Sequence, residues 1–133
     1  MTAKMNNNFI NYFDFLDILV QTFNTAPREL FENMIKMILS ILHQQTISLE
    51  KEALQIDEMN IIPFDDLEEY YDTILEDIED IKLLKKRVLA LKDRDILFDK
   101  FYNALDRLHQ AFILNIDRVG QLEIRVLSKE QSA

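Results

Sequence analysis

The chain has 133 residues and a formal net charge of −9; 48% of its residues are apolar, and it contains one glycine, two prolines and no cysteine. This length fits one domain over residues 1–133, and the apolar content excludes intrinsic disorder despite the acidity. The absence of cysteine excludes disulfide scaffolds, thiolate metal sites and cysteine nucleophiles, and the scarcity of glycine and proline favours a few long helices over sheets.

The first expected helix follows an asparagine-rich leader, and we place it over residues 8–23. Its apolar residues recur at the spacing of one face of an amphipathic helix: Phe9, Phe13, Leu16, Val20 and Phe23. The sequence "NTAP" then ends this helix, with Thr25 as the candidate N-cap of the next helix and Pro27 in its first turn. We expect residues 1–7 and 128–133 to be flexible ends.

The second helix resumes the helical period at Leu30 and continues it to Ile56. The segment "QTIS", residues 45–48, leaves two alternatives open, because Ser48 could cap a new helix. The sequence therefore predicts about four helices, or five if this segment divides the second one.

The clearest break in the chain is "NIIPF", residues 60–64. Its asparagine can end a helix in the left-handed conformation, and Pro63 prevents the helix from continuing. Asp65, three residues before Glu68, then forms an acidic version of the capping box, and we expect the third helix to run from here to about Leu91. Its apolar seam, with Lys85 in the remaining slot, consists of Leu67, Tyr71, Ile74, Ile78, Ile81 and Val88.

Asp93 or Asp95 offers an N-cap for the fourth helix. The apolar stripe of this helix consists of Phe98, Phe101, Leu105, Leu108, Phe112, Ile116 and Val119. Four amphipathic segments with short connections predict an all-α fold, an antiparallel bundle.

The tail of residues 120–127 fits two structures. Leu122, Ile124 and Val126 alternate as in a strand, whereas Val119, Leu122 and Val126 also have helical spacing. Since a lone strand could pair only with another molecule, we favour an extension of the last helix.

The sequence lacks the motifs of common enzyme sites. A phosphate-binding loop needs several glycines, and Gly120 is the single glycine of the chain. A nucleophilic triad needs a histidine close to its nucleophile, and the spacing around His43 and His109 suggests none. We therefore expect a protein that is not an enzyme and uses no cofactor.

Asp106 and His109 form the one pattern that resembles part of a metal site. Di-iron bundles use Glu-x-x-His on two helices together with two further glutamates. Here the spacing occurs once, with aspartate in place of glutamate, which leaves too few ligands for a closed site. We expect no metal, and a carboxylate–histidine metalloprotein is the least favoured function.

Membrane and nucleic-acid binding are also disfavoured. No run approaches the roughly 18 apolar residues of a membrane span, and the N-terminus lacks the uninterrupted apolar core of a secretory signal. The densest basic cluster, at residues 82–87, directly follows nine carboxylates, whose field repels nucleic acid. We therefore expect a cytoplasmic protein that binds neither membrane nor nucleic acid directly.

The net charge is concentrated in the segment from Asp65 to Asp80, "DDLEEYYDTILEDIED", which has nine carboxylates and no basic residue. The other 117 residues hold 15 acidic and 15 basic residues and are neutral together. A helical wheel places six of the nine acids opposite the apolar seam, in a row about 22 Å long. This acidic ridge consists of Asp65, Glu69, Asp72, Glu76, Glu79 and Asp80.

The ridge has two interpretations, a solvated face or a docking surface. Carboxylates complement the helix dipole only in the first turn, and solubility would be served as well by dispersed charge. We therefore expect an interaction protein, such as an inhibitor, immunity protein or adaptor, whose ridge binds a basic protein surface. The alternative is a structural homo-oligomer assembled through apolar helix seams, since the stripe of residues 9–23 also includes Ile10, Phe15 and Ile18.

Overall fold

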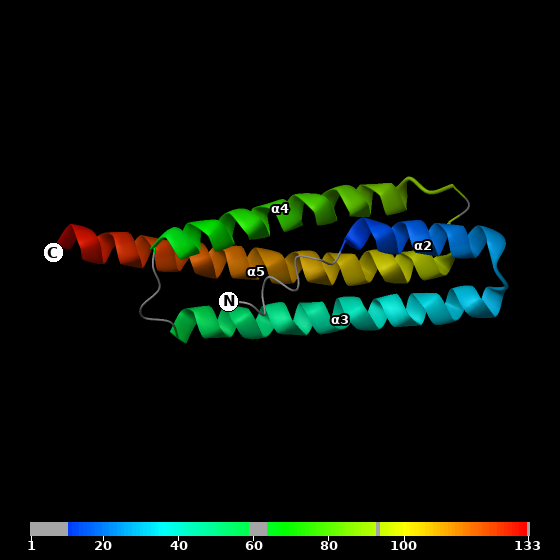
Figure 1. Ribbon diagram of the computed structural model, residues 1–133, viewed down its shortest axis with the longest axis horizontal. Coiled ribbons are helices and arrows are strands. Elements are labelled where there is room, and N and C mark those ends of the chain that lie inside the picture. Colours follow the sequence, from blue (N-terminus) through cyan, green and yellow to red (C-terminus); the bar gives the residue numbers. More distant parts are fainter. Residues whose placement is uncertain (1–10, 59–63, 93, 133) are drawn as a thin grey trace.

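The computed structural model describes residues 11–58, 64–92 and 94–132, and within them it contains four helices and no strand. The helices are α2 (Tyr12–Thr25), α3 (Arg28–Glu58), α4 (Phe64–Leu89) and α5 (Ile96–Ser132). Successive helices run in opposite directions (Figure 1). The prediction of an all-α antiparallel bundle is confirmed.

The helices differ in length, and this gives the bundle two unlike ends. Both α2 and α5 pack against α3 and α4. However, α2 has 14 residues, whereas α3, α4 and α5 have 31, 26 and 37. Consequently α2 lies along one end of the bundle, and at the other end α3, α4 and α5 remain, with α5 extending beyond its neighbours (Figure 1).

The four-helix end has an apolar core centred on phenylalanine. The rings of Phe23, Phe31 and Phe98 come from three helices, and their centroids lie 5.1 to 5.6 Å apart. Phe31 and Phe98 are almost fully buried. Such aromatic pairs add about 0.5–1.5 kcal/mol each beyond the burial of their surface, so this contact joins α2, α3 and α5 firmly.

The three-helix end has a smaller apolar cluster, Ile56, Val119 and Leu122, with a buried polar network beside it. The Asn115 side chain is 0% exposed, and its Nδ2 donates to the carbonyl oxygens of Leu49, at 2.7 Å, and of Ala111, at 3.1 Å. Because both amide hydrogens have acceptors, Asn115 is buried without losing its hydrogen bonds.

Tyr70 joins α4 to this network. Its hydroxyl donates to Glu52 Oε2 at 2.7 Å and lies 3.2 Å from Asn115 Oδ1. Burial, followed by the hydrogen bond to Glu52, raises the pKa of the Tyr70 hydroxyl. The phenol therefore remains a donor over the physiological pH range, and one polar cluster links α3, α4 and α5.

The helix boundaries confirm one predicted cap and correct two. Asp95 caps α5, because its Oδ2 accepts a hydrogen bond from the Leu97 amide at 2.9 Å; the other candidate, Asp93, lies outside the described residues. Thr25 is not the predicted N-cap: α3 begins at Arg28, and the Thr25 hydroxyl instead donates to the Gln21 carbonyl at 2.7 Å. This bond satisfies the hydroxyl within α2.

Asp65 is not an N-cap either, because α4 begins one residue earlier, at Phe64. Its backbone therefore lies inside the first turn, where a carboxylate complements the helix dipole without capping. The predicted break at residues 60–63 lies outside the described residues. At its other end α4 finishes at Leu89, two residues before the predicted end.

Two alternatives that the sequence left open are settled. Residues 45–48 do not interrupt α3, and the buried Thr46 hydroxyl donates to the Leu42 carbonyl at 2.9 Å, which satisfies it without breaking the helix. The tail is helical, since α5 continues to Ser132. The helix thus includes most of the expected flexible end at 128–133, and residues 1–7 lie outside the described part.

Candidate functional site

The acidic ridge lies on the outer face of α4. The helical period places Ile74, Ile78 and Ile81 in the core, so the opposite face points to solvent. Five of the six predicted ridge residues have exposed side chains: Glu69, Asp72, Glu76, Glu79 and Asp80. The side chain of the sixth, Asp65, lies outside the described part of the structure, although its backbone belongs to α4.

The charge of the ridge is compensated at one position among the described residues. Lys82 Nζ lies 3.4 Å from Glu79 Oε1, and both side chains are exposed. Such surface pairs contribute about 0–1 kcal/mol. Glu69, Asp72, Glu76 and Asp80 form no ion pair with a described residue, so the structure leaves four neighbouring carboxylates on one helix face available to an external cation.

Two of the basic residues that follow the ridge on α4, Lys85 and Arg87, contact neighbouring helices. Lys85 Nζ lies 2.7 Å from Asp106 Oδ1 on α5 and 5.4 Å from the centre of the Tyr102 ring. The Arg87 guanidinium lies over the Phe13 ring of α2, 4.8 Å from its centre. These two cations therefore hold α4 against its neighbours and do not pair with the carboxylates of the ridge.

Asp106 and His109 lie close together, but both contact the ammonium group of Lys85. Lys85 Nζ is 3.3 Å from His109 Nδ1 as well as bonded to Asp106. Burial, and then the charge of Lys85, lower the pKa of His109. In the described part of the chain no group of three or more histidine, cysteine, aspartate or glutamate side chains could hold a metal ion. The geometry is that of an interhelical ion pair.

Asp77 is a residue of this region that the sequence did not single out. Its side chain is half-buried between the ridge and α2, in a hollow of about 460 Å³ that it lines with Asn11, Tyr12, Phe13, Thr73, Glu76 and Asp80. Burial, and then the charges of Asp80 and Glu76, raise the pKa of Asp77 from 3.8 to about 6. A helical wheel gives only a coarse signal for such a residue, because Asp77 falls at the edge of the apolar sector.

The apolar residues of α2 are largely used within the bundle. Phe13, Phe15, Val20 and Phe23 are half-buried against the core, and Ile18 is 40% exposed. Ile10 lies outside the described residues. Since α2 packs against two helices, a wide apolar arc is what its position requires. The width of this arc therefore gives no support to assembly through apolar seams.

Comparisons with known proteins do not extend this picture. No protein-family model, no curated protein and no solved structure matches the chain. Among the described residues, no helix combines the length and apolarity that crossing a bilayer requires.

Proposed function

We propose that the protein is a non-enzymatic, cytoplasmic interaction module, such as an inhibitor, immunity protein or adaptor, whose acidic ridge binds a basic surface on a protein partner. The observation that supports this proposal is the set of exposed ridge carboxylates that have no cationic partner among the described residues: Glu69, Asp72, Glu76 and Asp80. Their combined potential would attract a basic surface from a distance and orient it before contact.

The arrangement of the ridge fits a folded partner. From Glu69 to Asp80 the row extends about 16 Å along α4, at 1.5 Å per residue. The core packing of Ile74, Ile78 and Ile81 fixes α4 in place, so the carboxylates are held in a defined row rather than on a mobile tail. A rigid row loses little conformational entropy on binding, and it matches lysine or arginine side chains spaced along a helix or strand edge.

The test compares two variants with the same change in net charge. The ridge variant replaces Glu69, Asp72, Glu76 and Glu79 with the corresponding amides. The control variant makes the same kind of change at four exposed acids elsewhere: Asp17, Glu29, Glu50 and Asp117. Both sets lie off the apolar core, so both variants should fold, and circular dichroism checks this.

Each protein is immobilised and exposed to a lysate of its source organism, and captured proteins are identified by mass spectrometry. We expect a basic protein that the wild type and the control variant retain and the ridge variant loses. Stopped-flow association with that protein should be slower for the ridge variant and less sensitive to salt, because salt screens the steering between exposed charges. Equal association rates for all three proteins at every ionic strength would show that the ridge is only a solvated face.

A further inference from the structure

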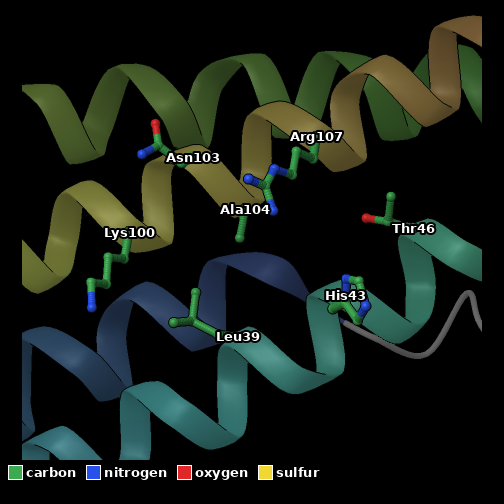
Figure 2. Close-up of a pocket in the computed structure, with 7 residues that line it drawn as sticks. All are labelled: Leu39, His43, Thr46, Lys100, Asn103, Ala104 and Arg107. Atoms are coloured by element: carbon green, nitrogen blue, oxygen red, sulfur yellow. The ribbon is translucent and has the colours of Figure 1, made fainter.

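A second charged surface lies between α3 and α5, away from the acidic ridge on α4. We call it the α3/α5 groove. It is a hollow of about 320 Å³ lined by Leu39, His43 and Thr46 of α3 and by Lys100, Asn103, Ala104 and Arg107 of α5 (Figure 2). Its two charged side chains, Lys100 and Arg107, are both basic, in a chain whose net charge is −9.

Lys100 and Arg107 are exposed cations that the protein does not use for its own packing. Neither forms an ion pair or lies over an aromatic ring of any described residue. In contrast, Arg28 and Lys85 each have both an acidic partner and an aromatic one. With 24 acids for 15 bases in the chain, two cations that meet no carboxylate in one hollow are available to an external anion.

The groove is hollow at Ala104, because the small side chain of this residue leaves space between longer neighbours. Ala104 lies between Lys100 and Arg107 on α5, and Leu39 lies on α3 across from it (Figure 2). The two cations are two helical turns apart, about 10.5 Å along the axis. The Arg107 guanidinium lies close to Ala104, and the Lys100 side chain lies toward the other end of the groove (Figure 2). The groove thus has an apolar floor between two cationic ends.

The remaining polar residues complete the set of donors. His43 and Asn103 are exposed on the two helices, at opposite edges of the groove (Figure 2). The Thr46 hydroxyl is buried and already donates to the Leu42 carbonyl, so it offers lone pairs rather than a proton. The donor groups among the lining residues are therefore a guanidinium, an ammonium, an imidazole and an amide, and they come from two helices.

We propose that the α3/α5 groove binds a small phosphate-bearing molecule, with its phosphoryl oxygens held by Lys100 and Arg107. A carboxylate is satisfied by one bidentate arginine, whereas a phosphoryl group has three oxygens that accept donors from several directions. The volume lies at the lower end of the range of about 300–1,000 Å³ for small-molecule sites. Side chains supply all the donors, so the site does not need a glycine-rich loop.

Isothermal titration calorimetry of the whole chain with pyrophosphate and with ADP tests this proposal. We expect saturable binding with one site per chain for at least one of these probes. The double variant Lys100→Gln/Arg107→Gln should bind at least about tenfold more weakly, because it removes two charge-assisted hydrogen-bond donors. Both residues are exposed, so circular dichroism should show an unchanged fold.

The matched control is Lys51→Gln/Lys92→Gln, which removes the same charge from exposed positions that do not line the groove. We expect this variant to bind as the wild type does. An equal loss of affinity in the control would reduce the effect to net charge and overturn the proposal, as would the absence of saturable binding for both probes. Tighter binding of ADP than of pyrophosphate would identify a nucleoside contact on the apolar floor, and equal binding would identify recognition of the phosphate alone.

Discussion

At the end of the bundle that α2 covers, three phenylalanine rings meet in an apolar core, whereas at the other end α3, α4 and α5 meet around a buried asparagine. The apolar end gains stability from buried area and shape, and it tolerates apolar substitutions that conserve volume. The polar end depends on hydrogen bonds that form in one register only. At the end that α2 covers, buried apolar surface supplies the stability. At the three-helix end, directional hydrogen bonds supply it.

The largest expected effect is at the four-helix end. Phe98 is 2% exposed, and its ring contacts those of Phe23 and Phe31. Phe98→Ala should lower the free energy of unfolding by about 3–5 kcal/mol, because it removes buried area and leaves a cavity. Urea unfolding measures the loss. Ile96→Ala is the control, since Ile96 is 69% exposed, and it should change stability by less than about 0.5 kcal/mol. A small loss for Phe98→Ala would mean that the aromatic core can collapse around the gap.

The next effect is at the three-helix end, and it should be of intermediate size. Asn115→Ala removes the two hydrogen bonds that Nδ2 donates and the one that Oδ1 accepts, and it leaves the Leu49 carbonyl without this donor, at a cost of about 1–3 kcal/mol. Tyr70→Phe should cost about 1 kcal/mol through the bond to Glu52. Because the Tyr70 hydroxyl and Asn115 Oδ1 lie 3.2 Å apart, the two losses should not be additive in a double-mutant cycle. Strict additivity would show that the two residues act separately.

The sequence predicted the elements of this fold better than their contacts. The stripe from Phe98 to Val119 is strictly periodic, and six of its seven residues are buried. In α2 the apolar residues cover a wide arc, so periodicity could not fix the centre of the buried face. The structure buries Tyr12, Leu16 and Leu19 and leaves Phe13 and Val20 half-buried, because α3 and α4 both contact this helix.

The same distinction applies to the charged sites. The acidic ridge lies on one helix, and spacing alone placed its six residues on the exposed face, which the structure confirms for the five whose side chains it describes. The α3/α5 groove combines His43 with Lys100 and Arg107, which are more than 50 positions away in the chain. No pattern within one helix can show this proximity. Asp77 was missed for a related reason, since its burial depends on where the N-terminus of α2 lies.

Asp77 marks the boundary between the two ends, where α2 begins, and it gives the smallest expected effect. Its pKa is about 6 in the folded protein, above the ordinary value of 3.8, so the folded state holds the proton more tightly than the unfolded chain. The resulting stabilisation is complete below pH 3.8 and is lost as the pH rises through about 6. Asp77→Asn should remove this dependence and raise stability at pH 7 by about 1 kcal/mol. A pKa shift corresponds to about 1.36 kcal/mol per unit. We expect less than the full value for this shift, because solvent screens the half-exposed carboxylate.

The measurement is the difference in thermal stability between wild type and variant at a series of pH values from 4 to 8. Taking the difference cancels the contributions of the other acids. The difference should grow in favour of Asp77→Asn between about pH 4 and 6 and then stay constant. Asp72→Asn is the matched control, because it removes the same charge from an exposed position on the ridge. The positive end of the α2 dipole faces the same hollow and opposes the effects of burial and of the neighbouring carboxylates. Parallel curves for wild type and Asp77→Asn would mean that the dipole fully offsets them, and that the start of α2 accepts the carboxylate without loss of stability.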